Sequence, residues 1–296
     1  MSRLKELKIR IKSVKSTKKI TQAMKIVAAS RLKQAQQNVI NSEEFYQKFS
    51  YLLKTLHEDD KSIFNDYALT SVDKGIKEKI LIIVFSSDRG LCGAFNAKLT
   101  KELLNTVDQY KKNKVGINIV GVGNKISVHL NLHYKDILEF SVPFTPNGTK
   151  MTAYKSILQF GNKIQTMFEK EKYTECRVIY TDFNSVINQK ISNEKLLPID
   201  TNKFIEEHDD NTNLKYDNST EESLSYISRN FINAKLNNIF MNSLASEYSS
   251  RMLAMDNATK NSESMLKELN VLYNRNRQAL ITKELIEIIS GAEAIN

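Results

Sequence analysis

The 296-residue chain is poor in residues that interrupt regular structure or cross-link it. It contains only nine glycines and three prolines, which excludes collagen-like, linker-like and disordered chains. Its two cysteines, Cys92 and Cys176, lie far apart and belong to no Cys/His cluster, which excludes a disulfide framework and the usual zinc-finger spacings. We therefore expect a folded protein from a reducing compartment, without a bound metal.

Long hydrophobic runs are also missing. The longest, residues 80–85 (ILIIVF), is far shorter than the ~18 residues that a membrane span requires. The sequence thus predicts a soluble or peripheral protein, and its length predicts one or two folded units.

Positive charge is concentrated at the N-terminus. Residues 1–40 hold eleven Lys and Arg side chains against one acid, Glu6, and therefore account for the whole net charge of +9. Such an arm can meet nucleic acid, anionic lipid or an acidic protein surface, or be the solvated face of a helix. A mitochondrial transit peptide is a further reading, but the helical spacing continues without a cleavage-like break. Residues 1–44 contain no aromatic side chain, which favours a protein or membrane-proximal partner over nucleic acid.

Two tracts without glycine or proline flank the middle of the chain, before Gly75 and between Pro198 and Gly291. Their apolar residues follow helical spacing. In the first tract these are Leu4, Leu7, Ile11 and Val14 and, after a phase shift, Ile20, Met24 and Val27. In the second they form a ladder of steps of three and four from Met241 to Ala279 that includes Met255, Ser262, Met265, Leu269 and Leu272. Helices this long predict an antiparallel coiled coil.

The middle of the chain has the pattern of an α/β domain. We expect strands at 80–85, 116–121, 136–140 and 176–183, and helices at 94–110 and 152–171. Alternating strands and helices predict a mostly parallel, Rossmann-like sheet. The predicted domains are residues 1–75 (N-terminal coiled-coil helix), 76–212 (inserted α/β domain) and 213–296 (C-terminal coiled-coil helix), with the acidic stretch 200–220 as a surface connection.

The sequence carries no complete nucleotide-binding motif. Gly116 and Gly121 have Walker A spacing, but Val122 and Gly123 occupy the places of the required Lys and Ser/Thr. Ile126 stands where a dinucleotide fingerprint needs its third glycine. We therefore expect no bound cofactor.

Signs of catalytic chemistry are equally weak. His129 and His133 have the i, i+4 spacing of a metal pair but no accompanying glutamate, and Asp136 would join them only if the helix continued that far. We interpret them as surface histidines. Cys92 beside Arg89 has no nearby histidine as a base, which favours a structural thiol. The chain is not expected to be an enzyme.

Three segments resemble the gamma subunit of F-type ATP synthases. They are residues 9–30 (IRIKSV with TKKITQAMKIVAAS), residues 87–96 (SDRGLCGAFN) and residues 281–294 (ITKELIE through SGAEA). The resemblance covers essentially the whole chain.

The resemblance implies a rotor stalk without catalytic activity or cofactor of its own. In that family the coiled coil stands inside a hexamer of alpha and beta subunits, and the α/β domain contacts the epsilon subunit and the membrane c ring. Proton flow turns ring and stalk, and the stalk drives the beta sites through different affinities. The expected location is the cytoplasmic face of the bacterial inner membrane, as a peripheral protein that binds no nucleic acid.

The resemblance also implies site residues. Met24, Arg251, Gln278, Thr282 and Glu284 match the family's coupling contacts with the hexamer. Arg89 and Cys92 lie in the turn near the acidic catch loop of beta, and Lys18, Lys19 and Lys25 suit the same loops by charge. A nucleic-acid-binding coiled coil and an α/β nucleotide hydrolase are the alternatives. The stretch 206–220 matches nothing in the family.

Overall fold

The computed structural model describes residues 2–59, 69, 78–144, 150–170, 173–200 and 220–293. The chain forms two compact units, and each is described by itself. Unit 1 joins Met1–Ser30 to Arg251–Asn296, and unit 2 is Arg31–Ser250. Both boundaries fall within long helices, so the units cut across the domains predicted in chain order. Residues 201–219 of the predicted connection at 200–220 lie outside the described residues.

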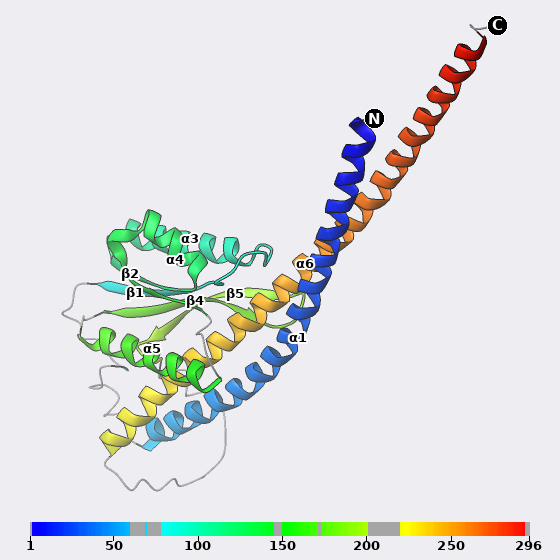
Figure 1. Cartoon of the computed structure of the whole chain (residues 1–296). Coiled ribbons are helices and arrows are strands. Elements are labelled where there is room, and N and C mark those ends of the chain that lie inside the picture. Colours follow the sequence, from blue (N-terminus) through cyan, green and yellow to red (C-terminus); the bar gives the residue numbers. More distant parts are fainter. Residues whose placement is uncertain are drawn as a thin grey trace. The chain divides into compact units, whose positions relative to one another are not determined.

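Unit 2 is built on a five-stranded sheet with the order β3-β2-β1-β4-β5 (Figure 1). The strands are β1 (Lys79–Phe85), β2 (Gly116–Val122), β3 (Leu138–Val142), β4 (Glu175–Phe183) and β5 (Gln189–Leu197). The first four are parallel, and β5 pairs antiparallel with β4. The predicted mostly parallel α/β sheet is confirmed.

Two details of the strand prediction were wrong. The third strand begins at Leu138 rather than at residue 136, because Lys135–Ile137 forms a 3-10 turn, η1, in which the Ile137 amide donates to the Tyr134 carbonyl. The strand β5 was missed because its sequence, QKISNEKLL, lacks a clear alternation of apolar and polar residues.

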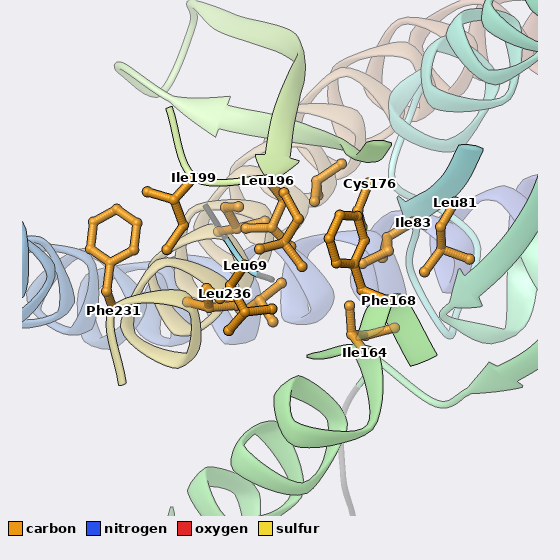
Figure 2. Close-up of a cluster of buried hydrophobic side chains, with 14 of the residues drawn as sticks. Leu69, Leu81, Ile83, Ile164, Phe168, Cys176, Leu196, Ile199, Phe231 and Leu236 are labelled. Carbon is orange, nitrogen blue, oxygen red and sulfur yellow. The ribbon is translucent and has the colours of Figure 1, made fainter. Parts of the chain in front are cut away.

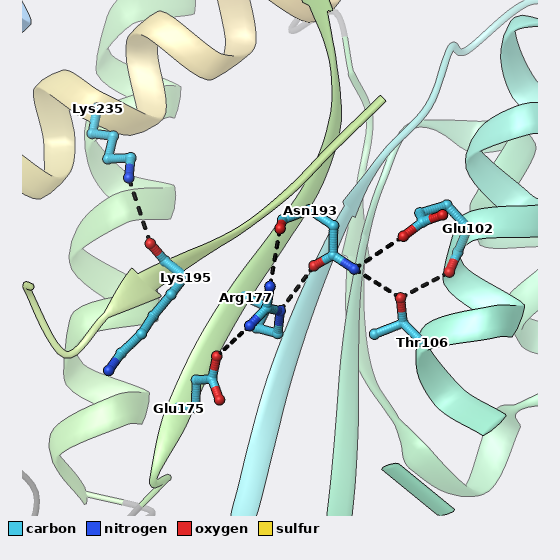
Figure 3. Close-up of polar contacts among 7 residues, drawn as sticks. All are labelled: Glu102, Thr106, Glu175, Arg177, Asn193, Lys195 and Lys235. Atoms are coloured by element: carbon cyan, nitrogen blue, oxygen red, sulfur yellow. Dashed lines mark hydrogen bonds and ion pairs between the residues drawn. The ribbon is translucent and has the colours of Figure 1, made fainter. Parts of the chain in front are cut away.

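Polar contacts fix β5 instead. Arg177 of β4 donates from Nε to Asn193 Oδ1 at 2.8 Å (Figure 3). Asn193 Nδ2 donates in turn to Thr106 Oγ1 of α3 (Phe95–Lys112) at 2.9 Å. At the other side of the strand, Lys235 forms an ion pair with Glu194 at 3.4 Å. The polar side chains that hid this strand in the sequence thus help to hold it in place, together with the buried Leu196 and Leu197 at its end.

Helices cover both faces of the sheet, and the alternation of β1 separates two cores. Ile80, Ile82 and Val84 pack with α3 (Phe95–Lys112) and α4 (Asn124–His133). On the other face, Leu81, Ile83 and Phe85 pack with α5 (Lys150–Lys170) and with the parts of the two long helices that belong to unit 2 (Figure 2). The helix predicted at 152–171 is therefore confirmed as α5.

The two long helices are α1 (Ser2–Asp59) and α6 (Thr220–Glu293). Within unit 1 they run antiparallel, as the ion pairs Lys18–Glu263 and Lys25–Asp256 show. The predicted antiparallel coiled coil is confirmed.

The predicted phase shift in α1 was wrong. The less exposed positions of unit 1 continue in unbroken steps of three and four at Leu4, Leu7, Ile11, Val14, Lys18, Thr21, Lys25 and Ala28, and Met24 and Ala29 are half-buried beside this seam. Ile20 and Val27 are instead 56% and 52% exposed. Polar partners fill the seam where the apolar pattern breaks: Thr259 Oγ1 donates to Thr21 Oγ1 at 2.8 Å, between the two ion pairs. The apolar side chains are therefore free to face away from α6.

The ladder predicted for α6 was partly right. Met255, Ser262 and Leu269 are buried, whereas Met265 and Leu272 are 42% and 40% exposed. No helix within the described part of the chain has the length and apolar character of a membrane span.

Candidate functional site

The turn after β1 is closed by its own side chains. The Ser87 amide donates to Asn96 Oδ1 at 3.0 Å, and Asn96 Nδ2 donates to Ser87 Oγ at 2.8 Å and to Cys92 Sγ at 3.2 Å. Leu91 and Gly93 adopt left-handed conformations, with φ of 63° and 60°. The signature SDRGLCGAFN thus encodes a rigid turn that leads into α3.

Asp88 joins this turn to two neighbouring strand ends. Its Oδ1 accepts from the backbone amides of Asn124 at 3.0 Å, at the start of α4, and of Phe144 at 2.9 Å, just after β3. Gly123 makes the approach of the two loops feasible, because at its φ of 103° a Cβ atom would lie 2.3 Å from the Ser86 carbonyl oxygen. One carboxylate therefore links the loops that follow β1, β2 and β3.

This arrangement disfavours phosphate at α4. In nucleotide-binding folds, the amides at a helix N-terminus hold the phosphate after a glycine-rich turn. Here the carboxylate of Asp88 already accepts from the first amide of α4. A phosphate would have to displace an anion of the same sign, which gives a geometric reason for the incomplete motif at Gly121 and Gly123.

The outer side of the turn is available for contacts. Arg89 and Leu91 are exposed, whereas Cys92 is buried. The burial of Cys92 agrees with its interpretation as a structural thiol, and the large exposed side chains of the turn are those of Arg89 and Leu91. Contact of Arg89 and Cys92 with a catch loop stays a prediction.

The coiled-coil lysines have partners within the chain. Lys18 Nζ lies 2.9 Å from Glu263 Oε1, and Lys25 Nζ lies 2.6 Å from Asp256 Oδ1. Hydrogen bonds from Lys25 and Lys260 lower the pKa of the Asp256 carboxyl to about 2. Lys19 is exposed and lies outside the seam. Of the three lysines assigned to catch loops by charge, Lys19 is thus the one left pointing away from α6.

An apolar stripe runs along α1 on the side away from α6. At about 100° per residue, Ile9, Ile20 and Val27 fall within about 20° of one another and roughly opposite the seam. All three are exposed. Sequence reasoning missed this stripe because it placed Ile20 and Val27 in the seam, although the spacings of 11 and 7 residues would have revealed it.

A second apolar surface lies at the end of α6. The register of the two ion pairs, continued to the start of α1, places Ser2 level with Ala279. Beyond this level α6 continues alone, as Figure 1 shows for unit 1. Its exposed apolar side chains there are Ile281, Leu285, Ile286, Ile288 and Ile289.

The predicted coupling residues fall at two levels of unit 1. Met24 of α1 and Arg251 of α6 are half-buried, and Arg251 is the first residue of α6 in unit 1. Gln278, Thr282 and Glu284 are exposed near the end of α6, where Thr282 Oγ1 donates to the Gln278 carbonyl at 3.0 Å. The last three therefore share the level of the apolar end, with only Gln278 and Thr282 in contact, and the first two lie apart from them.

The histidine pair has the predicted geometry but no third ligand. The rings of His129 and His133 are 4.7 Å apart between centroids. The helix α4 ends at His133, so Asp136 lies on η1. Within the ranges that the structure covers, no three His, Cys, Asp or Glu side chains are grouped to hold a metal ion. Burial, followed by the charge of His133, lowers the pKa of His129.

Comparison with known proteins gives one consistent result. The sequence profile of a family described as ATP synthase matches residues 3–295. The ATP synthase gamma chain of Pelagibacter ubique is 37% identical over 295 residues, and that of Paramagnetospirillum magneticum is 35% identical over 297 residues, in each case over the full length of both chains.

Solved structures agree with the sequence comparison. A chain of the Tetrahymena thermophila mitochondrial ATP synthase central stalk and c ring superposes with a TM-score of 0.59 at 25% identity, over 81% of this chain and 99% of that one. A chain of the Euglena gracilis mitochondrial enzyme gives a TM-score of 0.68 at 16% identity, over 99% and 95%, which supports the fold.

Proposed function

The chain belongs to the gamma-subunit family of F-type ATP synthases, and from this premise we propose that it is the central rotor stalk of a proton-translocating ATP synthase. The observation that carries the proposal is the pair of apolar surfaces of unit 1, on α1 opposite the seam and on the end of α6. If the two helices packed only on each other, these apolar side chains would stay in water and contribute nothing to stability, so the two surfaces indicate contact with other proteins.

The mechanism follows from an uneven rod inside a ring of catalytic subunits. Each beta subunit has conformations of different nucleotide affinity, and a rotating partner changes their populations only through contacts that differ between them. The seam carries ion pairs at Lys18 and Lys25, the outer face of α1 carries an apolar stripe among exposed lysines, and the end of α6 is a single helix. The stalk thus presents different chemistry at each angle and height while it binds no nucleotide itself.

The proposed partners are the alpha and beta subunits around unit 1, and the epsilon subunit and membrane c ring at unit 2. Association with the membrane is then indirect, at the cytoplasmic face of a bacterial inner membrane. The titles of the similar structures name a central stalk with a c ring, which supports this arrangement.

We assign different tasks to the two kinds of side chain in unit 1. Ile286 and Ile289 give smooth apolar contact with little angular preference, which suits a bearing. Arg251, Gln278 and Thr282 form directional hydrogen bonds, which suit holding the stalk at particular angles. Met24, Arg89 and Glu284 are proposed as further coupling contacts.

Purified assembled complexes test this assignment. Alanine at Ile286 and Ile289 should lower the temperature of complex dissociation more than the rate of ATP hydrolysis. Alanine at Arg251 or Gln278 should lower hydrolysis more than dissociation temperature. The reverse ranking would refute the assignment, and failure of every variant to differ from the parent would refute contact with the hexamer.

The lysines need a separate experiment because two of them have partners in the chain. Lys19→Glu should weaken coupling of hydrolysis to proton pumping, since it reverses a charge that faces away from α6. Lys101→Glu, at an exposed lysine of α3 in unit 2, is a matched control for net charge. If both variants pump protons at the parental ratio, Lys19 is only solvated.

The alternative reading as a nucleotide hydrolase makes a different prediction. We expect the isolated chain to show no saturable ATP binding by calorimetry, because Asp88 occupies the amide at the start of α4. Micromolar, stoichiometric binding would contradict this.

A further inference from the structure

Unit 2 contains an apolar cavity of about 330 Å³ between the sheet and helices α5 and α6. Four phenylalanine rings from four different elements line it: Phe85 of β1, Phe140 of β3, Phe160 of α5 and Phe240 of α6. Aliphatic side chains, among them Val122 and Leu236, complete the walls. The cavity is therefore a meeting point of the sheet with two helices.

Water is a poor occupant of this space. The site is open to solvent on one side, but its largely apolar lining offers water few polar partners. At the ~30 Å³ that one water molecule occupies in the liquid, the cavity has room for about eleven non-hydrogen atoms. Its volume and apolar lining are those of a site for a small organic ligand.

The polar side chains of the lining share one side. Ser156, Gln159 and Lys163 all come from α5, and their spacing of three and four residues places them on one face of that helix. The Lys163 ammonium lies 3.4 Å from the centroid of the Phe140 ring. No carboxylate pairs with Lys163 among the residues that the structure describes. The cavity thus offers one cation and two neutral polar side chains along α5, and hydrocarbon elsewhere.

We propose that this cavity binds a medium-chain carboxylate, such as octanoate, with the chain among the phenylalanine rings and the carboxylate at Lys163. A ligand with several polar groups would leave some of them without partners, which is unfavourable in an apolar site. A single anionic head on a hydrocarbon chain matches both the lining and its charge. The inference stands independently of the rotor function, because it rests on unit 2 alone.

Calorimetry of the full-length chain with octanoate tests the proposal. We expect saturable binding of one octanoate per chain, and a loss of about fourfold in affinity for each methylene removed between octanoate and hexanoate. Octanol and octyltrimethylammonium carry the same chain without the negative charge, and both should bind at least threefold more weakly. Chains longer than the cavity should gain little further affinity.

Variants separate the head from the chain. Lys163→Gln should weaken octanoate binding by about threefold to fivefold and leave octanol binding unchanged. Lys170→Gln removes an exposed lysine of the same helix outside the lining and should change neither. Val142→Phe should fill the cavity and abolish binding of both ligands, with circular dichroism to show that the fold is retained.

The following results would overturn the proposal that the cavity binds a medium-chain carboxylate. Absence of saturable octanoate binding to the parental chain would overturn the proposal. Equal binding of octanoate and octyltrimethylammonium, or an unchanged affinity in Lys163→Gln, would show that Lys163 does not select the head and would overturn it as stated.

Discussion

Unit 1 and unit 2 each contain part of α1 and part of α6, but they stabilise these parts differently. In unit 2, residues 222–250 of α6 are mostly buried and pack against the sheet, α5 and α1. In unit 1, residues 251–291 of the same helix are mostly exposed and touch α1 along one seam with polar layers. A core of apolar contacts fixes the first part, whereas the second keeps its apolar side chains for other molecules. One helix thus serves as scaffold at one end and as contact surface at the other.

The largest difference should appear at a glycine in unit 2. Gly123→Ala should destabilise unit 2 by about 4 kcal/mol, because the residue needs a positive φ and the new Cβ would meet the Ser86 carbonyl. Gly116→Ala, at the other end of β2, is the matched control. There the Cβ would lie 3.4 Å from the movable Lys79 side chain, so a loss within about 1 kcal/mol is expected. Urea denaturation of the full-length chain measures both, and equal losses would contradict the role of the turn.

The same substitution in the two parts of α6 tests the comparison directly. Ile232 is fully buried, and Ile232→Ala should cost about 3 kcal/mol in unfolding free energy. Ile286 is 58% exposed, and Ile286→Ala should stay within about 0.5 kcal/mol in the isolated chain. A comparable loss at Ile286 in the isolated chain would mean that the end of α6 is already enclosed without partners.

Disulfide formation tests the polar seam of unit 1. Cysteines in place of Thr21 and Thr259 should form a disulfide in high yield, since the two Oγ1 atoms are 2.8 Å apart. A Thr21 and Ser262 pair, one layer away, should give little. Adding Lys25→Glu should lower the yield of the first pair, and Asp256→Lys in the same chain should restore it because the opposite charges are again adjacent. A yield that ignores both charge changes would show that the ion pair does not set the register.

The smallest effect concerns pH. Burial raises the pKa of the Asp182 carboxyl above 3.8, and the charges of Glu194 and Glu43 add to the shift, against a hydrogen bond from the Phe183 amide and the charge of Lys190. A folded-state pKa above the unfolded one means that unit 2 loses stability as the pH rises from below 3.8 through the raised pKa. Asp182→Asn should therefore be more stable than the parent at neutral pH and lose this advantage on acidification.

Chemical denaturation at several pH values measures this difference. Asp108→Asn, at an exposed position of α3, is the control and should leave the stability curve unchanged. A neutral-pH loss of stability in Asp182→Asn would reverse the sign of the argument.

The comparison also explains what the sequence could reveal. The strand β1 was predictable because burial on both faces demands an unbroken apolar run, and β2 and β4 because each holds a shorter, β-branched run of the same kind. The seam of α1 was misread at Ile20 and Val27 because a pattern of apolar residues cannot show which face meets α6 and which faces away from it. Polar seam positions such as Thr21 and Lys25 become visible only with their partners on α6.

The site was predictable in outline for a related reason. The turn at residues 87–96 was predictable because its sequence resembles the signature of the family. The hydrogen bond from the Phe144 amide to Asp88 was not predictable, because it joins residues 56 positions apart. No local pattern encodes such a contact. The cavity lined by four phenylalanines likewise arises from packing between elements, and the sequence spacing of these phenylalanines does not predict it.

The part of α6 beyond Ala279 has a mechanical consequence. Two helices joined by ion pairs are stiffer against bending and twisting than one helix, because deforming one of them must shift or break its contacts with the other. A single helix has only its own backbone hydrogen bonds to oppose the same load. Under torque, strain will therefore concentrate in residues 280–293, which act as a compliant extension, while the paired segment behind them transmits rotation with little loss of angle.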